Sequence, residues 1–385
     1  MDDLGVEIAV GFVSTYPPAK CGIATFTESL RQAMVSPLLL CQLGVVSCVD
    51  EPGVLDHPPE VVGELVGGSA ESIVAAAAAL DGFDVVVVQH EFGIFGGEDG
   101  REVVELVALV SAPMIVVLHT VLRRPSANQR EIVEQLAEMA EFVVVLSETA
   151  RARLLAAYSV SPERVRVIPH GAHANLSPAT PVRDSRQRPM VLTWGLIGRD
   201  KGIEFAIEAL AQLRDLDPLP RYIVLGQTHP RILSTEGEAY RNMLVARARA
   251  FGVDDLVEFD NYYPDTKSLL ERVRAADIVL LPYRSREQDV SGVLVEAIAS
   301  GKPVVATRFP HAIELVGKGS GILVPHEDPG AIAAALRSLL TKPALAARAA
   351  ALARRQAQAH DQENVGRSYC QLVVAAAGIR VPVAS

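Results

Sequence analysis

Short apolar runs recur along the first half of the chain, and stretches with helical periodicity separate several of them. The runs are continuous and rich in Val and Ile, which is typical of parallel strands buried on both faces. We predict strands over Val6–Val13, Leu39–Val46, Val85–Val88, Met114–Leu118, Phe142–Leu146 and Val165–Ile168, and helices over Ile23–Met34, Arg101–Val110 and Ser126–Ala140. This alternation predicts an open α/β sheet with helices on both faces.

The pattern breaks after Leu176, where three prolines occur in a polar stretch without periodicity. Residues 177–189 therefore read as a linker between domains. A second series follows, with predicted strands Met190–Leu196, Tyr222–Gly226, Leu256–Phe259, Ile278–Leu281, Pro303–Ala306 and Gly321–Val324, and helices Ile203–Leu213, Glu236–Ala250 and Val293–Ser300. We predict two doubly wound domains, 1–176 and 190–360, with a ligand cleft between the carboxyl ends of the two sheets.

The C-terminal region is rich in Ala and Arg but keeps an apolar stripe at helical spacing. We expect packed helix over Pro329–Gln358, rather than a disordered tail. A final helix is predicted near Glu363–Ala377.

Composition narrows the function class. The chain has 385 residues, 49% of them hydrophobic, and a net charge of −10. These values favour a globular protein of two domains and argue against a nucleic-acid binder. No apolar stretch is long enough to span a membrane without interruption, which leaves surface contact with a membrane open. The oligomeric state is not readable.

The four cysteines are Cys21, Cys41, Cys48 and Cys370. They show no C-x-x-C spacing and no pair of histidines nearby at metal-ligand spacing, so we expect reduced thiols in a cytoplasmic protein and no metal site.

The strongest candidate for chemistry follows the predicted strand Ile278–Leu281. A polar loop ends at Ser291 and Gly292, which open a helix whose first turn includes Val293. Backbone N–H groups and the helix dipole make such a turn a binding site for a phosphate. Glu296 lies one turn further on, where its carboxylate can accept hydrogen bonds from vicinal hydroxyls such as those of a ribose.

This segment resembles glycosyltransferase family 4, whose members have the GT-B fold: two Rossmann-like domains that face an interdomain cleft. The family shows two acidic residues eight positions apart and then E-A-x-A-x-G-x-P-V-V-A-T, and the run from Glu296 to Thr307 is close to a full match. The resemblance implies that Glu296 holds the donor ribose. The family glutamate that contacts the hexose corresponds to Gln288, whose amide can still bind a hydroxyl. Glu287 lies one position away, so a shifted register of the loop is the alternative, and we favour Gln288.

A second segment, Thr193–Gly202, resembles the family motif G-R-L-x-x-x-K-G, whose cations neutralise the donor diphosphate. Lys201 and Gly202 match, whereas the Arg position is Leu196. We expect Lys201, with Arg199 from the same loop, to stabilise the negative charge that builds as the sugar leaves.

The first domain offers weaker features. Gly22 opens a helix after the first strand and resembles the glycine of the family that lies against the donor. His119 ends a strand where family members place a histidine that faces the transferred sugar. His90 is a candidate contact to donor or acceptor, whereas His170, in a segment that precedes the linker, is expected to be structural. The resemblance also implies that the final helix packs back on this domain.

The resemblance implies a retaining, metal-independent transfer of a hexose from a nucleotide sugar to a carbohydrate or glycolipid acceptor. The opening segment is similar to actinobacterial-type mannosyltransferases, which favours GDP-mannose as the donor, with UDP-glucose next. An epimerase or phosphorylase of the same fold is one alternative, and a binding module without activity is another. The D-x-D pair Asp215 and Asp217 lies in a loop far from the predicted phosphate turns and is set aside.

Overall fold

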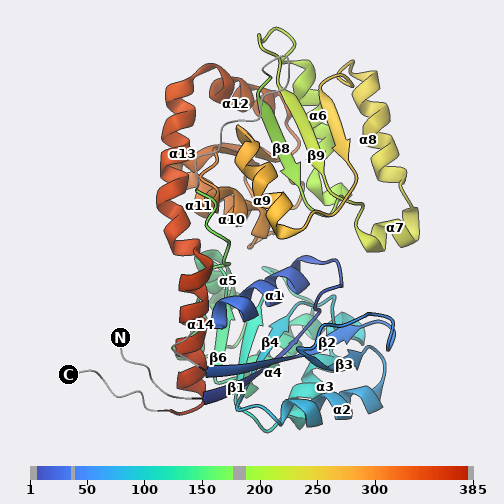
Figure 1. Cartoon of the computed structure of the whole chain (residues 1–385), viewed down its shortest axis with the longest axis vertical. Coiled ribbons are helices and arrows are strands. Elements are labelled where there is room, and N and C mark those ends of the chain that lie inside the picture. Colours follow the sequence, from blue (N-terminus) through green and yellow to red (C-terminus); the bar gives the residue numbers. More distant parts are fainter. Residues whose placement is uncertain (1–6, 36–39, 177–187, 380–385) are drawn as a thin grey trace, which may run out of the picture. The chain divides into compact units, whose positions relative to one another are not determined.

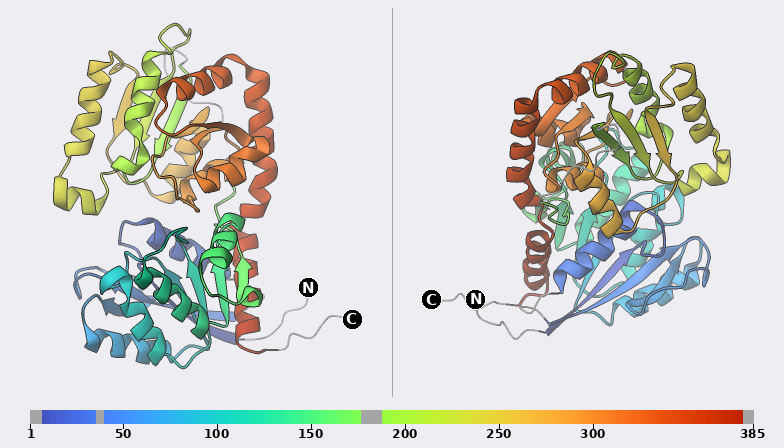
Figure 2. Two further views of the ribbon diagram at one scale, coloured as in Figure 1. Left: turned by 180° about the vertical axis from the view of Figure 1, so that it is seen from behind. Right: turned by 45° about the horizontal axis from the view of Figure 1, so that its top comes forward.

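The computed structural model describes residues 7–35, 40–176 and 188–379, and they form two compact units. Unit 1 comprises Met1–Gly171 and Gln362–Ser385, and unit 2 comprises Ala172–Asp361. Each unit is a parallel sheet with helices on both faces (Figure 1; Figure 2). Unit 1 has its own hydrophobic core, and unit 2 has a core on each face of its sheet.

The sheet of unit 1 has seven strands in the order β3-β2-β1-β4-β5-β6-β7. Their bounds are β1 Glu7–Ser14, β2 Leu40–Val49, β3 Val61–Val66, β4 Val85–His90, β5 Met114–Leu118, β6 Phe142–Val145 and β7 Val165–Val167. The helices are α1 Gly22–Met34, α2 Ala70–Leu80, α3 Glu102–Leu109, α4 Ala127–Met139, α5 Glu148–Ala157 and α14 Gln362–Ala376. Every residue of β4 and β5 is buried, which explains why these strands are uninterrupted apolar runs in the sequence.

Unit 2 repeats this plan with six strands in the order β10-β9-β8-β11-β12-β13. The strands are β8 Met190–Trp194, β9 Arg221–Leu225, β10 Val257–Asp260, β11 Ile278–Leu281, β12 Val304–Thr307 and β13 Gly321–Val324. The helices are α6 Ile203–Ala211, α7 Pro230–Glu236, α8 Ala239–Ala250, α9 Thr266–Ala275, α10 Gly292–Ala299, α11 Pro310–Leu315, α12 Pro329–Thr341 and α13 Pro343–Ala357.

Alternate residues of the strands in unit 2 face opposite cores. Val191 and Tyr222 pack beneath α6, α8 and α12, whereas Leu192 and Ile223 share a core with α10 and α11. Trp194 is two residues after Leu192 and so faces the α10 side. This periodicity places the last residue of β8 against the helix that carries Glu296.

Both sheets are entirely parallel, and in each the chain order reverses once. The reversal lies between β1 and β4 in unit 1 and between β8 and β11 in unit 2. The predicted pair of doubly wound Rossmann-like domains, the GT-B architecture, is confirmed. In such sheets ligands bind beyond the carboxyl ends of the strands at the reversal, so the loops after β8 and β11 are the first place to look.

The predicted helix Glu236–Ala250 is wrong in its first turn. Gly237 adopts a φ of 59°, which ends α7, and α8 begins only at Ala239. The predicted helical tail is likewise two helices, because Pro343 cannot continue α12 and instead opens α13.

The strand β3 was not predicted. It pairs only with β2, and most of its residues are partly exposed, so Gly63 and Glu64 interrupt the apolar pattern that marks the central strands.

The boundary between the units lies at Gly171 and Ala172, five residues before the predicted one. The amide N–H of Ala172 donates to His360 O at 2.8 Å. Asn175 Nδ2 donates to Leu270 O and to Ser300 Oγ, both at 2.9 Å. These hydrogen bonds assign the segment before the predicted linker to unit 2. Residues 177–187 of that linker lie outside the described residues.

The final helix α14 belongs to unit 1 and packs against α1. The two helices approach closely at Gly366, where a Cβ atom would lie 2.4 Å from Ala33 O. Tyr369 and Val373 are fully buried on the same helix. Only glycine allows this approach without moving one helix away from the other.

Candidate functional site

The loop after β8 contains a single turn of 3-10 helix, Arg199–Lys201, followed by Gly202. Gly202 has a φ of 61°, and a Cβ there would lie 2.1 Å from Pro282 O, so this position requires glycine. The tight contact places the loop directly beside the end of β11. It also fixes where Lys201 leaves the backbone.

Lys201 is half-buried, with 17% of its side chain exposed. Its Nζ lies 3.2 Å from Asp200 Oδ2 and 4.4 Å from the ring centroid of Tyr283, which follows β11. Burial favours the neutral amine, but Tyr283 and Asp200 outweigh it and raise the pKa of Lys201 above its ordinary value. The side chain is therefore a fixed cation at neutral pH, as binding of a diphosphate requires.

Arg199 points to a different partner. Its Nη2 lies 3.0 Å from Glu236 Oε2 at the end of α7, and its guanidinium stacks over Tyr240 of α8. More than half of the Arg199 side chain is exposed. An exposed pair of this kind contributes little to stability, so exchanging Glu236 for an anionic ligand costs little.

The loop between β11 and α10 ends in a capped helix. Ser291 is the N-cap of α10, and its Oγ accepts from the N–H of Leu294 at 3.3 Å. Its own N–H donates to Nδ1 of the buried His311 at 2.9 Å, and the N–H of His311 donates to Gln288 O at 3.3 Å. His311 thus joins both ends of the loop that holds Gln288, whose side chain is half-buried.

Gly292 and Val293 are the first residues of α10, where backbone N–H groups have no partner within the helix. Val293 lies beside the loop after β8, because a Cβ added to Gly195 would be 3.7 Å from Val293 Cγ2. The first turn of α10 and the loop of Lys201 therefore flank the same reversal of the sheet.

Glu296 is held by the last residue of β8. Trp194 Nε1 donates to Glu296 Oε2 at 2.8 Å, and Trp194 is 3% exposed. Burial raises the pKa of Glu296 to about 7, and the hydrogen bond from Trp194 opposes that shift. Tyr283 also interacts electrostatically with Glu296 and Lys201, so these three side chains form one cluster.

Gly22 and His119 lie in unit 1 and are linked through Phe26. Gly22 begins α1, Phe26 follows one turn later, and the Phe26 ring meets His119 edge-on at 4.8 Å and His170 at 4.9 Å. A Cβ at Gly22 would have no heavy atom within 4 Å. The packing of this unit therefore does not require glycine at that position.

His119 is neutral at physiological pH. Burial, with smaller contributions from His170 and His90, lowers its pKa to about 3. Gln89 Oε1 lies 2.7 Å from His119 Nε2. Since a carboxamide oxygen only accepts, Nε2 carries the hydrogen and Nδ1 keeps its lone pair. His119 can thus accept a hydrogen bond from a hydroxyl but cannot supply a positive charge.

His90 is fully buried, and neither ring nitrogen has a hydrogen-bond partner among the described residues. Burial lowers the pKa of His90 to about 4. Its ring lies 4.9 Å from Phe92 and 6.3 Å from Phe95. His170, predicted as structural, has its Nδ1 2.7 Å from Gly171 O at the end of the first segment of unit 1.

Sequence reasoning missed Trp194, Tyr283 and Gln89, which contact the predicted residues Glu296, Lys201 and His119, respectively. Each lies at or just beyond the carboxyl end of a strand next to the reversal of its sheet. Trp194 is also the single tryptophan of the chain. Position at these strand ends was the available signal, and the side-chain partners could not be read from it.

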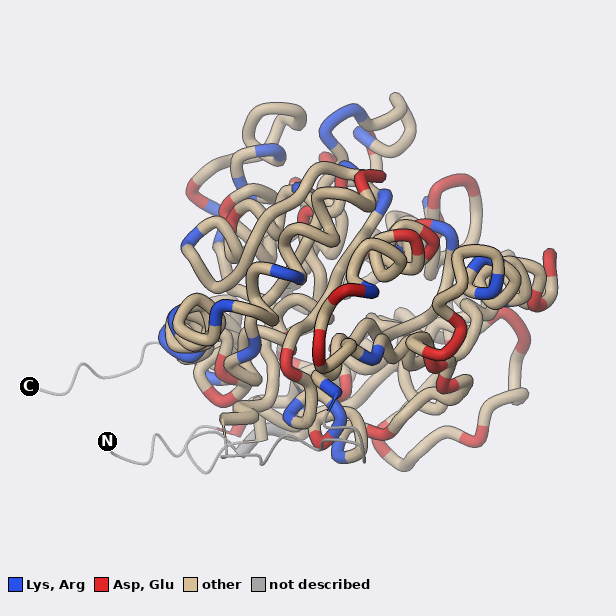
Figure 3. The backbone as a smooth tube through the Cα atoms, turned by 90° about the horizontal axis from the view of Figure 1, so that it is seen from above, with Lys and Arg blue, Asp and Glu red and all other residues tan. Residues whose placement is uncertain are grey.

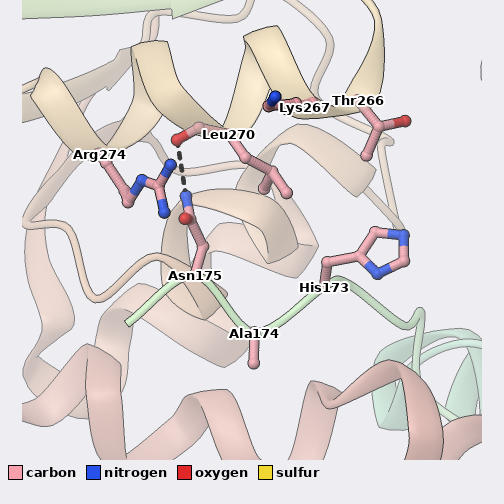
Figure 4. Close-up of a pocket in the computed structure, with 7 residues that line it drawn as sticks. All are labelled: His173, Ala174, Asn175, Thr266, Lys267, Leu270 and Arg274. Carbon is pink, nitrogen blue, oxygen red and sulfur yellow. Dashed lines mark hydrogen bonds between the residues drawn. The ribbon is translucent and has the colours of Figure 1, made fainter. Parts of the chain in front are cut away.

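Other features of the described residues lie apart from this cluster. An open pocket of about 410 Å³ in unit 2 is lined by His173, Ala174, Asn175, Thr266, Lys267, Leu270 and Arg274 (Figure 4). None of the predicted site residues lines it. Asp215, of the D-x-D pair, is bound by Arg337 through both carboxylate oxygens at 2.7 Å, which is a structural role.

Across the described part of the chain, no helix is long and apolar enough to cross a membrane. Cys21, Cys48 and Cys370 form no disulfide bond among the described residues, whereas the side chain of Cys41 is outside the description. Basic residues are interspersed with acidic ones along the described backbone (Figure 3).

Residues 42–176 match the family model "Glycosyltransferase Family 4", and residues 182–356 match "Glycosyl transferases group 1". A D-inositol 3-phosphate glycosyltransferase of Corynebacterium efficiens is 32% identical over 228 residues, which are 56% of this chain and 52% of that protein. One from Kineococcus radiotolerans is 30% identical over 246 residues, 58% of this chain and 55% of that protein. The chain thus spans about half the length of the curated relatives that it matches.

Two solved structures share the fold. Anabaena Alr3699/HepE in complex with UDP and glucose superposes with a TM-score of 0.76 at 19% identity, covering 96% of this chain and 100% of that one. Sucrose-phosphate synthase from Thermosynechococcus elongatus gives 0.74 at 20% identity, covering 95% and 98%.

Proposed function

This chain belongs to glycosyltransferase family 4, and on that premise we propose that it transfers a hexose from a nucleotide-diphosphate sugar to a hydroxyl group of a carbohydrate or glycolipid acceptor. The observation that carries the proposal is the cluster of Lys201, Tyr283 and Glu296 beside the first turn of α10. It brings together a fixed cation, the backbone N–H groups at the start of α10 and a carboxylate, all next to the point between β8 and β11 where the strand order reverses. These are the groups needed for a diphosphate and a ribose.

In this proposal the donor is held mainly by unit 2. Lys201 and the N–H groups of Gly292 and Val293 bind the diphosphate, Glu296 accepts from the ribose hydroxyls, and Gln288 contacts the hexose. Ser291 fixes the first turn of α10. Arg199 joins the diphosphate by leaving Glu236, its exposed partner.

The reaction proceeds with retention at the anomeric carbon. The bond from that carbon to the diphosphate oxygen breaks, and the acceptor oxygen bonds on the same face. The acceptor proton passes to the departing phosphate oxygen, so no carboxylate nucleophile is needed. Lys201 binds the leaving diphosphate more tightly as its charge grows, which lowers the barrier. No metal ion has a role in this scheme.

In unit 1, Gly22 and His119 are assigned to the sugar. Gly22 leaves room for the donor at the start of α1, where an added Cβ would meet nothing. His119 accepts a hydrogen bond from a sugar hydroxyl through Nδ1, because Nε2 already donates its hydrogen to Gln89 Oε1.

For the donor we retain mannose from GDP-mannose, on the similarity of the segment Ser14–Thr27 to mannosyltransferases. UDP-glucose is the second candidate, since the Anabaena protein of the same fold was solved with UDP-glucose. For the acceptor, the name of the curated relatives adds inositol 3-phosphate to the carbohydrates to be tested. A cytoplasmic location stays a prediction from the cysteine pattern.

The first experiment is a thermal-shift panel of GDP, UDP, ADP and their sugar conjugates with the purified chain. At one hundred times Kd a ligand adds about 2.7 kcal/mol, a shift of roughly 2–4 °C for domains of this size. A shift with one base selects the donor family. No shift with any nucleotide would contradict the proposed site.

The second experiment follows the products made from the selected donor with sugar and inositol 3-phosphate acceptors. An α-linked product from an α-linked donor, seen by NMR, supports retaining transfer. Conversion of the donor without acceptor would indicate an epimerase, and release of sugar phosphate a phosphorylase. Binding without any turnover would leave a binding module.

A further inference from the structure

The carboxylate of Glu296 is not positioned by its own helix. Glu296 lies in the second turn of α10, and the group that fixes it comes from the end of the neighbouring strand β8, through the 2.8 Å hydrogen bond from Trp194 Nε1 to Oε2. Trp194 packs in the core on that face of the sheet and is 3% exposed, so its indole cannot turn away. The hydrogen bond is thus held in place by the core.

One oxygen of the Glu296 carboxylate is bound by Trp194, and the other is available to a ligand. Among the described residues, the one hydrogen-bond partner of the carboxylate is Trp194, so Oε1 and the second lone pair of Oε2 remain for a ligand. An indole N–H can only donate, so it prefers the ionised carboxylate over the protonated form. Ribose hydroxyls that donate to Glu296 need the same ionised form.

We propose that Trp194 is a positioning residue for the donor: its N–H orients the Glu296 carboxylate and favours its ionised form, so that nucleotide affinity depends on this hydrogen bond. The inference deepens the proposed function and rests on its assignment of Glu296 to the ribose. Trp194 itself touches no donor atom in this scheme. Its effect therefore falls on donor binding and leaves the transfer step unchanged.

The surroundings of Glu296 give the proposal a pH signature. The ionisable side chains on the segments around α10 include Asp200, Lys201, Tyr283, His311, Arg354 and His360, of which Tyr283 interacts electrostatically with Glu296. Burial raises the pKa of Glu296 to about 7. Since the ribose binds the ionised carboxylate, nucleotide affinity should rise with pH up to about 7 and level off above it. Below that pH, binding should release the proton of Glu296, and above it no proton should be exchanged.

The single tryptophan makes the signal direct, because all tryptophan fluorescence of this chain comes from Trp194. We expect the emission of the ligand-free protein to change with a midpoint near pH 7 as its hydrogen-bond partner gains a proton. The change should be absent in Glu296→Gln, which keeps an acceptor oxygen but cannot titrate. A titration that persists in Glu296→Gln would overturn the proposal, whether or not the chain transfers sugar.

Trp194→Phe keeps the buried ring and removes the donor. We expect the pH midpoint of nucleoside-diphosphate affinity, measured by calorimetry with the base selected above, to rise by about one unit, so that affinity at pH 7 falls about fivefold. With an active donor and acceptor pair, the donor KM should rise by the same factor while kcat stays within about twofold. An unchanged midpoint and affinity would refute the role of Trp194.

Tyr222→Phe is the matched control. Tyr222 is also buried and loses one hydrogen bond, from its OH to Thr193 Oγ1 at 2.9 Å, on the opposite face of the same sheet. It should lower stability without moving the pH midpoint of nucleotide binding. If Trp194→Phe fails to fold, the fluorescence titrations of the wild type and Glu296→Gln still test the hydrogen bond. The pH dependence of nucleotide affinity, present in the wild type and absent in Glu296→Gln, then tests its effect on binding. If no nucleotide binds to the wild type at any pH, the proposed function fails, whereas the fluorescence result still tests the Trp194–Glu296 bond.

Discussion

At the scale of single residues, Lys201 is the cation that the structure holds most firmly at the proposed donor site. Lys201→Ala should lower kcat/KM by on the order of a hundredfold, about 2.7 kcal/mol, because the variant loses the charge that binds the leaving diphosphate. The raised pKa of Lys201 keeps it charged, so the loss should not vary between pH 6 and pH 9. Steady-state kinetics across that range test this, and a loss below about threefold would remove the assignment.

Gly22 gives a complementary test in unit 1. An alanine there meets no heavy atom within 4 Å and lies at the first position of α1, so stability should be unchanged within about 0.5 kcal/mol. If the donor approaches this turn, transfer should nonetheless fall by at least about tenfold, roughly 1.4 kcal/mol. Melting curves and rates on one preparation separate the effects. Full activity in a stable Gly22→Ala would exclude a close approach of the donor.

The sequence placed most of these residues correctly at strand ends and helix starts, because those positions follow from apolar periodicity and helix-opening residues. It could not predict their partners. Arg199 faces Glu236, and Trp194 reaches Glu296, which is 102 positions away in the chain. Such pairs depend on how strands order themselves in the sheet, and no local pattern records that order.

At the scale of elements, α14 and α1 are held together at Gly366. Helix propensity alone favours Gly366→Ala by up to about 1 kcal/mol. The added Cβ would lie 2.4 Å from Ala33 O, so we expect a net loss of roughly 1–3 kcal/mol instead. Denaturant unfolding tests the sign. Gln371→Ala, at an exposed position of the same helix, should change stability by less than about 0.5 kcal/mol.

The loop after β1 is anchored by a second small network. Tyr16 OH donates to Glu60 Oε1 at 3.0 Å and accepts from Arg31 Nε at 2.9 Å, and Arg31 pairs with Glu60 at 2.6 Å. Burial would raise the pKa of Glu60, but its own backbone N–H, Tyr16 and Arg31 outweigh that and lower it. The network therefore stabilises the fold above the unfolded pKa of about 4.3 and loses that contribution as pH falls below it.

Glu60→Gln tests this network. The variant should be less stable than the wild type at pH 7, by roughly 0.5–1 kcal/mol because the pair is partly exposed. The difference should shrink as pH falls below about 4.3. Urea unfolding at several pH values measures it. A gap that is the same at pH 3 and pH 7 would show that Glu60 acts through packing and not through its charge.

At the scale of the whole molecule, each unit has its own sheet and core, so we expect two calorimetric unfolding transitions. A bound nucleoside diphosphate should raise the transition of unit 2, which carries the proposed donor residues. Gly366→Ala should lower the transition temperature of unit 1, to which α14 belongs. Scanning calorimetry with and without nucleotide, on wild type and variant, checks both assignments. A nucleotide that raises only the transition lowered by Gly366→Ala would place its site in unit 1.

The two-domain α/β architecture was predictable because central parallel strands are buried on both faces and therefore form uninterrupted apolar runs. The edge strand β3 was not, since one of its sides has no partner strand and its residues need not be apolar. The unit boundary also shifted, because Ala172 and Asn175 owe their placement to distant hydrogen bonds. The order of strands and helices along the chain could be predicted from the sequence. The unit to which Ala172 and Asn175 belong could not.

The position of α14 has a consequence for biosynthesis. Unit 1 begins the chain, yet its last helix is translated only after all of Ala172–Asp361. At ~5–20 residues per second, the α1 surface that receives α14 stays uncovered on the ribosome for on the order of 15–65 s, because about 330 residues separate the two helices. During that interval unit 2 can fold completely, while unit 1 waits with an apolar surface exposed to chaperones. Unit 1, whose synthesis starts first, therefore completes its fold last.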